Sequence, residues 1–250
     1  MAFEQWLADL ERRHLADLRV PEVTRALRAL SSAYVERRHA IGRGGALDST
    51  GKRAAFALFY APLHFLAATH VLRSVGAAVQ AAPATILDIG CGTGAAGAAW
   101  ALVADGSPRV VGIDRNAWAV HEARNTYRAL GIRGVARQGD AARLPRLGAG
   151  SAAIAGYVLN ELTPVLRAGV EDYLFEAAER GARVLVLEPI ARSIAPWWEQ
   201  TARRATDAGG RADEWRFQVD LPPLLRTFDT AAGLNHGELT VRSLWLPGRR

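Results

Sequence analysis

The chain has 250 residues, of which 50% are apolar and 22% charged; these values are typical of a globular protein and exclude a disordered chain, a collagen-like repeat and a disulfide scaffold. Its single cysteine, Cys91, excludes an intrachain disulfide and a structural zinc site built on cysteines, and we expect the reducing cytoplasm as its location. The formal net charge is +6, with 11 basic and 7 acidic residues in 1–80, 11 and 11 in 81–190, and 9 and 7 in 191–250.

Residues 1–80 are predicted to form a helical extension that acts as a lid or a docking surface. Apolar residues recur at helical spacing in 3–18 and in 21–40, and Pro21 stands at a first helical position. Ser49 and Thr50 are suited to cap a third helix that continues to about residue 78. Three glycines between the second and third helices indicate a loop, namely Gly42, Gly44 and Gly45.

Pro62 is expected to kink or split the third helix, because proline lacks a backbone N–H. The apolar stretch 54–69 contains Pro62 and His64 and is predicted to be too short to cross a bilayer, so no membrane partner is expected. The first residues do not show a basic segment followed by an apolar one, and we therefore expect no signal peptide.

Residues 81–250 show short apolar runs that alternate with helical patterns. This alternation predicts an α/β fold with a mainly parallel, Rossmann-like sheet covered by helices. The expected helices are 95–104, 117–130 and 164–180. The expected strands are 85–89, 110–113, 135–138, 152–158 and 184–187, followed by late strands at 215–219 and 239–246, one of them antiparallel, with no long helical pattern between those two.

The strongest motif joins the first strand to the first helix of this region. It reads Asp88-Ile-Gly90-Cys91-Gly92-Thr-Gly94. Glycine permits positive φ and a close approach of the backbone to a ligand, and the helix that follows offers unpaired N–H groups to an anion.

This motif leaves two cofactor classes open, because Gly92, Gly94 and Gly97 also match the dinucleotide pattern G-x-G-x-x-G. Asp88 favours S-adenosylmethionine, since a carboxylate there can hold the ammonium of a methionine moiety, directly or through water, and would repel a pyrophosphate. The D-x-G-x-G-x-G order resembles the first motif of the class I methyltransferases, and a glycine-rich turn without a ligand is the alternative.

Two further strand ends carry acids suited to an adenosine ligand. Asp114, followed by Arg115, ends the second strand, where a carboxylate can accept both ribose hydroxyls; its alternative role is the N-cap of the next helix. Asp140 and Ala141 follow the third strand, where the class I resemblance implies an acid against the adenine amino group and a backbone N–H near a ring nitrogen. An ordinary turn aspartate is the alternative for Asp140.

The acceptor is expected beyond the carboxyl ends of the fourth and fifth strands. Asn160 can orient an acceptor amine or hydroxyl through its amide oxygen, and Glu161 or Glu188 can accept a proton if one must leave. Tyr157 can stack on a base or a ring. As alternatives, Asn160 caps the helix near 163–164 and Glu188 only satisfies loop amides.

Aromatic residues alternate with arginines in 197–217 and resemble a surface that stacks on bases and contacts phosphates. Trp197 is the candidate substrate-binding residue there, and packing in the core is the alternative. The surrounding residues are Trp198, Trp215, Phe217, Arg203, Arg204, Arg211 and Arg216. The six histidines are scattered, and no metal site is predicted.

In order along the chain, these pieces resemble the ribosomal small-subunit methyltransferase-like proteins known from mitochondria and bacteria. The resemblance includes the segments 29–34, 54–62, 159–162, 187–189 and 213–217 besides the glycine motif. It implies an S-adenosylmethionine fold that acts on, or assembles with, ribosomal RNA.

Two departures from that family accompany the resemblance. The C-terminal region lacks the cysteines that hold an iron–sulfur cluster in many members, with Arg216 where a cysteine is expected, and Tyr60 stands near an expected arginine. A methyltransferase for RNA, with ribosomal RNA as the expected acceptor, is the leading hypothesis. The alternatives are a methyltransferase for a small-molecule acceptor, a non-catalytic ribosome-assembly protein that keeps the cofactor fold, and an NAD(P) oxidoreductase.

The charge distribution agrees with a polyanionic partner at the flanks of the chain. An alternative needs no partner: 30 of the 31 basic residues are arginine, a composition that a GC-rich genome also produces.

Overall fold

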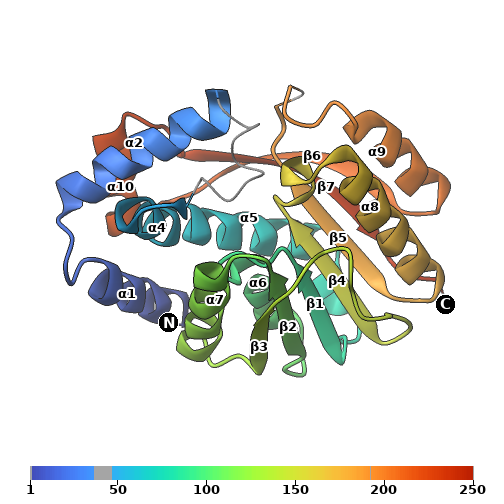
Figure 1. Ribbon diagram of the computed structural model, residues 1–250. Helices are drawn as coiled ribbons and strands as arrows, with labels where there is room; N and C mark the ends of the chain where they lie inside the picture. The colour runs from blue at the N-terminus through green and yellow to red at the C-terminus, as the bar shows by residue number, and fades with distance from the viewer. Residues whose placement is uncertain (1, 37–46, 192, 250) are drawn as a thin grey trace. The chain divides into compact units, whose positions relative to one another are not determined.

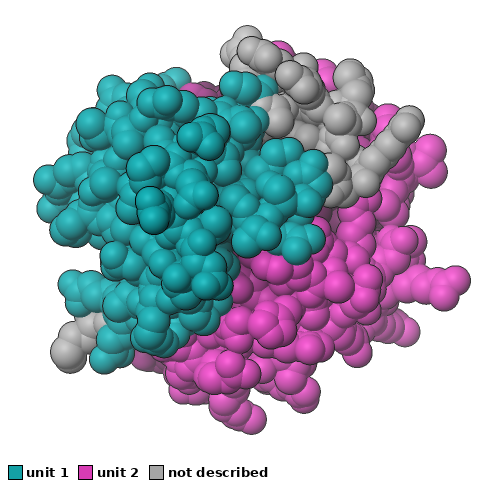
Figure 2. All heavy atoms as spheres, turned by 60° about the vertical axis from the view of Figure 1, so that its left-hand side comes forward, with its two compact units in different colours: residues 1–63, 216–239 teal, residues 64–215, 240–250 magenta. Residues whose placement is uncertain are grey.

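The computed structural model describes residues 2–36, 47–191 and 193–249. These residues form two compact units, one of residues 1–63 and 216–239 and the other of residues 64–215 and 240–250 (Figure 2). The predicted boundary at residue 80, with a helical extension before it and the cofactor domain after it, stays a prediction.

The strands form one seven-stranded sheet (Figure 1). Its order is β3-β2-β1-β4-β5-β7-β6; the first five strands in this order are parallel, and β7 runs antiparallel to β5. The predicted α/β class and the antiparallel late strand are confirmed. The strands are β1 (Thr85–Ile89), β2 (Arg109–Asp114), β3 (Gly134–Gln138), β4 (Ser151–Gly156), β5 (Arg183–Glu188), β6 (Arg211–Gln218) and β7 (Glu238–Leu246).

The helices of the larger unit follow the strands in alternation. Helix α6 packs on β1 and β2, α7 on β2 and β3, and α8 on β5. Asn116 caps α7 by accepting from the N–H groups of Trp118 and Ala119, and Thr163 caps α8 ahead of Pro164. The helices are α6 (Ala95–Val103), α7 (Ala117–Ala129), α8 (Pro164–Glu179) and α9 (Trp198–Asp207).

The smaller unit is helical and has its own buried core. Helix α2 packs on α4 and on α10, and the buried side chains include Trp6, Leu10 and Leu27. Its helices are α1 (Ala2–His14), α2 (Val20–Glu36), α4 (Thr50–Ala55), the π-helical turn η2 (Phe56–Tyr60) and α10 (Pro223–Ala232). The predicted glycine loop at 42–45 and the end of the predicted helix 21–40 lie outside the described residues.

Helix α1 ends four residues before the predicted residue 18. The side chain of Glu22 accepts a hydrogen bond from Arg19 N at 2.8 Å, which starts the next helix and draws the preceding residues out of helical geometry. The predicted cap of the third helix is confirmed, since Ser49 accepts from Lys52 N.

Pro62 does not split the third helix. A π-helical turn precedes it, in which Ala61 N donates to Phe56 O, and α5 (Ala61–Ser74) continues the helix beyond it. The helix ends at Ser74 rather than 78, before the left-handed Gly76 and the short 3₁₀ helix η3 (Ala77–Val79). The continuous helix Thr50–Ser74 has 25 residues and is long and apolar enough to cross a membrane, so the predicted insufficient length was wrong; 67% of its apolar window is buried, as in a core helix of a soluble protein.

Two helices were not predicted, α9 and the helix α10 between the two late strands. Helix α10 has only 10 residues and begins at a pair of prolines, 222 and 223, which indicate a turn more strongly than a helix. The predicted strand 152–158 ends at Gly156, because Tyr157 adopts a left-handed φ of 60° that a strand cannot continue.

Candidate active site

The glycine turn after β1 is the first part of the site. Gly90, Gly92 and Gly94 have φ values of 59°, 52° and 79°, a region that side chains avoid. The turn is tied to the neighbouring strand by Cys91 N, which donates to Ile113 O at 3.0 Å. Helix α6 begins directly behind it and directs its first N–H groups toward the turn.

The three glycines differ in what surrounds them. A Cβ at Gly90 would lie 2.2 Å from Val158 Cγ2, and one at Gly94 would lie 2.7 Å from the Tyr127 ring, so both positions are required for packing. A Cβ at Gly92 would meet nothing within 4 Å. Gly92 therefore borders open space that a ligand lying along the backbone can fill, and this fits the S-adenosylmethionine predicted there.

Asp88 is enclosed beneath the turn, with 1% of its surface exposed. Its Oδ2 accepts from Gly97 N at 3.0 Å. Burial raises the pKa of Asp88 to about 7; the Gly97 N–H lowers it, and nearby Asp114 raises it further. A bound ammonium would favour the ionised carboxylate, which agrees with the predicted contact to a methionine moiety.

Asp114 ends β2 and lies half-buried beside the turn. Its Oδ2 accepts from Gly92 N at 2.9 Å and its Oδ1 from Asn116 N at 2.8 Å. Because Asn116 is the N-cap of α7, the alternative role of Asp114 as that cap is wrong. Each oxygen keeps a lone pair for a ligand hydroxyl.

A cavity of about 610 Å³ opens at the carboxyl ends of β2 and β3. It is lined by Ile113, Arg137, Gln138, Gly139, Asp140, Ala142 and Arg143. Asp140 is exposed, and its Oδ1 accepts from Ala142 N at 2.9 Å in a turn that includes Ala141. The exposed Arg115 follows β2, and its carbonyl accepts from the Gln138 side chain at 2.9 Å. This arrangement is suited to the predicted adenine contact.

The acceptor side is built on the ends of β4 and β5. Glu188 is completely buried; its Oε1 accepts from Leu159 N at 2.9 Å and from Asn160 N at 3.3 Å, and its Oε2 from Asn160 Nδ2. Burial raises the pKa of Glu188 to about 8, while the Asn160 and Leu159 donors lower it. Glu188 thus satisfies loop amides, as in its alternative interpretation, and Thr163 rather than Asn160 caps α8.

Tyr157 and Glu161 lie half-buried beside this loop. The Tyr157 ring stacks on His64, with 4.0 Å between centroids and 17° between planes. Burial raises the pKa of Glu161 to about 7; Asp114 raises it further and Arg115 lowers it. Glu161 thus responds to the charges of Asp114 and Arg115 at the end of β2, and a carboxylate of raised pKa is suited to accept a proton.

Trp197 takes no part in the described hydrogen bonds at these strand ends. It packs half-buried against the apolar core, and the Arg167 guanidinium lies 5.0 Å from its ring centroid. Arg204 pairs with Asp172 and Arg211 with Asp213, each at 2.6 Å. These contacts support the core-packing alternative, and the substrate-binding role of Trp197 stays a prediction.

Two contributors to the site were not predicted. His64 stacks on Tyr157, which leaves the strand with a positive φ, and no local pattern signals this contact. Tyr127 of α7 is buried, and its ring packs against Gly94. Its place in an apolar helical stripe indicated only that it would be buried.

Comparison with known proteins identifies the domain. Residues 86–179, which contain the glycine turn, Asp114 and Asn160, match the family described as "Methyltransferase domain". These residues form a class I methyltransferase domain. Its cofactor is S-adenosylmethionine, and the enzyme is an S-adenosylmethionine-dependent methyltransferase.

Solved methyltransferase structures are similar to this chain at low sequence identity. A candidate O-methyltransferase of Nostoc punctiforme is 15% identical with a TM-score of 0.53, covering 90% of this chain and 69% of that chain. A candidate RNA methyltransferase of Pyrococcus horikoshii is 11% identical with a TM-score of 0.50, covering 76% and 86%. The N-methyltransferase NodS of Bradyrhizobium japonicum, in complex with S-adenosyl-l-homocysteine, is 17% identical with a TM-score of 0.49, covering 74% and 88%. No curated protein sequence matches this chain significantly.

Proposed function

We propose that this methyltransferase acts on RNA. The observation that supports it is a group of exposed arginines beside the cofactor side of the sheet: Arg115 after β2, Arg137 in β3, and Arg143 and Arg146 in the loop after β3. None of the four forms an ion pair within the part of the chain that the structure describes. Unpaired guanidinium groups next to the site are suited to the phosphates of a polyanionic acceptor.

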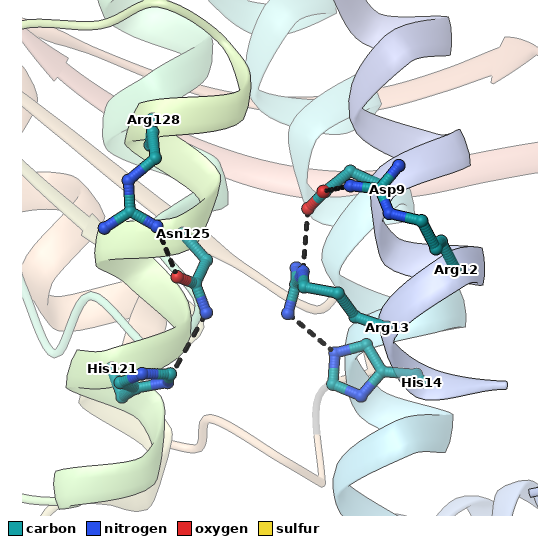
Figure 3. Close-up of polar contacts among 7 residues, drawn as sticks. All are labelled: Asp9, Arg12, Arg13, His14, His121, Asn125 and Arg128. Atoms are coloured by element: carbon teal, nitrogen blue, oxygen red, sulfur yellow. Dashed lines mark hydrogen bonds and ion pairs between the residues drawn. The ribbon is translucent and has the colours of Figure 1, made fainter. Parts of the chain in front are cut away.

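Two arginines of helix α1 are less available. On α1, Arg12 and Arg13 both pair with Asp9, which neutralises part of their charge (Figure 3). On α7, by contrast, Arg128 donates to the neutral side chain of Asn125, whose amide meets His121 (Figure 3). Arg128 lies in the last turn of α7, which leads into the start of β3, so its charge is on the same edge of the sheet as that of Arg133 and not with the four arginines.

When bound, S-adenosylmethionine supplies a methyl group activated on a sulfonium: the acceptor lone pair forms the new bond to carbon, the C–S electron pair stays on sulfur, and a proton leaves the acceptor. The protein's task is to hold the acceptor atom in line with the methyl group and to exclude water from the site. We infer that Asp88, Asp114 and the backbone at Gly92 hold the cofactor, that Asp140 and Ala141 contact its base, and that Glu161 accepts the proton.

Ribosomal RNA is the acceptor that the family resemblance favours. The test is transfer of a tritiated methyl group from S-adenosylmethionine to an unmodified transcript of small-subunit ribosomal RNA, with fractionated protein and metabolites as parallel acceptors. Label in RNA supports the proposal, whereas label only in metabolites would replace it with the small-molecule alternative. Cofactor binding without transfer to any fraction would favour a non-catalytic assembly protein.

A matched pair of variants tests the arginines. Arg137→Ala with Arg143→Ala should reduce the slope of log affinity for the transcript against log salt by about 2, because two phosphate contacts are lost. The control is Arg109→Ala with Arg133→Ala; these exposed arginines lie at the opposite ends of β2 and β3 and remove the same charge. Equal slopes for both double variants would contradict the proposed surface.

A further inference from the structure

The buried Glu188 carboxylate is connected to the acceptor side through one residue. Its Oε1 accepts two backbone N–H groups, from Leu159 and Asn160, which fixes the carboxylate plane. Its Oε2 then faces the Asn160 side chain and accepts from Nδ2. A carboxylate that only closed the loop would need the two backbone contacts and no contact to the Asn160 amide.

A second acceptor fixes the same amide. Asn160 Nδ2 also donates to Tyr157 O at 3.3 Å. A backbone carbonyl can only accept, so it favours the same orientation, with the NH₂ end of the amide inward. Both hydrogens of Nδ2 therefore have partners in the protein.

The orientation of the amide determines what it offers to a ligand. Because the amide group is planar, fixing Nδ2 turns Oδ1 away from Glu188. No hydrogen bond to Asn160 Oδ1 occurs among the described residues. An oxygen held in this way can accept a hydrogen bond and cannot donate one.

We propose that Glu188 is a positioning residue that holds the Asn160 amide with Oδ1 toward the acceptor, and that the acceptor atom carries hydrogen, as an exocyclic amine or a hydroxyl does. This inference rests on the proposed methyl transfer to RNA for its substrate class. An amine or hydroxyl hydrogen on Oδ1 directs the lone pair of the same atom away from Asn160, whereas a base carbon or an unprotonated ring nitrogen gains nothing from this oxygen.

The first experiment needs no acceptor. The chain contains four asparagines, Asn116, Asn125, Asn160 and Asn235, so labelling with [¹⁵N]asparagine gives four side-chain NH₂ signals in NMR, and Asn160→Ala assigns one of them. We expect both Asn160 Nδ2 hydrogens to exchange slowly with water. Fast exchange of both hydrogens in the folded protein would overturn the proposed orientation.

Glu188→Gln tests the cause of the orientation. The two backbone N–H groups hold the carbonyl of the introduced side-chain amide, so its NH₂ would face the NH₂ of Asn160 and force the Asn160 amide to turn over. We expect the Asn160 NH₂ signals to move and their exchange to become fast. Unchanged Asn160 signals in this variant would contradict a role for Glu188 in orientation.

A double variant separates positioning from a purely structural role. Glu188→Gln should lower kcat/KM for methyl transfer to the transcript by about 50-fold. The turned Asn160 amide would then present its NH₂ group, a donor, to the N–H or O–H group of the methyl acceptor. Adding Asn160→Asp places one carboxylate oxygen toward the introduced amide at position 188 and the other toward the methyl acceptor. We expect kcat/KM to return to within about fivefold of the wild type. A double variant no better than the single one would reject the proposal.

Product analysis tests the substrate class. Methylation at an exocyclic amine or a ribose hydroxyl supports the inference, and methylation at a base carbon overturns it. If the transcript takes up no label while Asn160 shows the expected NMR behaviour, the proposed RNA acceptor fails and the orientation by Glu188 stands, so the two failures are distinguishable.

Discussion

The ends of β2 and β5 carry the same chemical group and use it differently. Each accepts hydrogen bonds from two backbone N–H groups: Asp114 from Gly92 in the neighbouring turn and from Asn116 two residues on, and Glu188 from Leu159 and Asn160 in the loop after β4. Asp114 remains half-buried and keeps lone pairs for a ligand, whereas Glu188 is completely buried and accepts a hydrogen bond from the half-buried Asn160 side chain. The degree of burial thus decides whether a strand-end carboxylate binds a ligand or positions the residue that does.

Substitution of each of the two carboxylate residues tests this comparison and has the largest expected effect. Asp114→Ala should weaken S-adenosylhomocysteine binding by about 100-fold, since two charge-assisted hydrogen bonds to ribose are lost, as measured by calorimetry. Glu188→Gln should change this affinity by less than about threefold. Similar losses in the two variants would show that the two strand ends do not have separate tasks.

The open space at Gly92 gives a second test on the cofactor side. Gly92→Ala should lower the affinity for S-adenosylhomocysteine by about tenfold or more, because the added Cβ enters the space assigned to the ligand. Gly131→Ala is the matched control, since Gly131 also has a positive φ, of 66°, and nothing within 4 Å of its Cβ position. Both variants should lose about 1 kcal/mol of unfolding free energy, measured in urea. An equal loss of affinity in both would contradict the assigned ligand position.

The buried Asp88 predicts how ligand binding depends on pH. Its pKa in the folded protein, about 7, lies above the ordinary 3.8, so the folded protein retains this proton between those values and stability falls as pH rises through this range. A ligand ammonium favours the ionised carboxylate. The affinity for S-adenosylhomocysteine should therefore rise by up to about tenfold per pH unit from pH 5.5 to 7 and level off above it.

Asp88→Asn is the control for this pH dependence, because Glu161 has a raised pKa near the same value. The variant should flatten most of the rise in calorimetric titrations at several pH values. A rise that persists unchanged in Asp88→Asn would assign the proton to Glu161 or to another group.

The stacked pair on the acceptor side gives the smallest expected effect. His64→Ala removes the ring that lies 4.0 Å from Tyr157 and should lower the unfolding free energy by about 1 kcal/mol more than His64→Phe, which keeps an aromatic partner. Urea unfolding measures both. Equal losses would mean that stacking does not stabilise Tyr157 in its left-handed conformation.

The same contrast explains how far the sequence could be interpreted. The glycine turn, Asp88 and Asp114 lie within one strand–turn–helix–strand segment, so local spacing predicted their arrangement. The orientation of Asn160 and the His64–Tyr157 stack depend on a buried carboxylate 28 residues away and on one positive φ, which no local pattern contains. Helices α9 and α10 were missed because each is only 10 residues long and lies near prolines or charged residues.

A crystal structure with S-adenosylhomocysteine tests the central claim most directly. We expect the ligand along the backbone at Gly92, with its ribose hydroxyls on Asp114 and its amino group toward Asp88. A saturating complex with the ligand bound elsewhere, or a dinucleotide pyrophosphate that occupies the turn in its place, would contradict the assignment of this site.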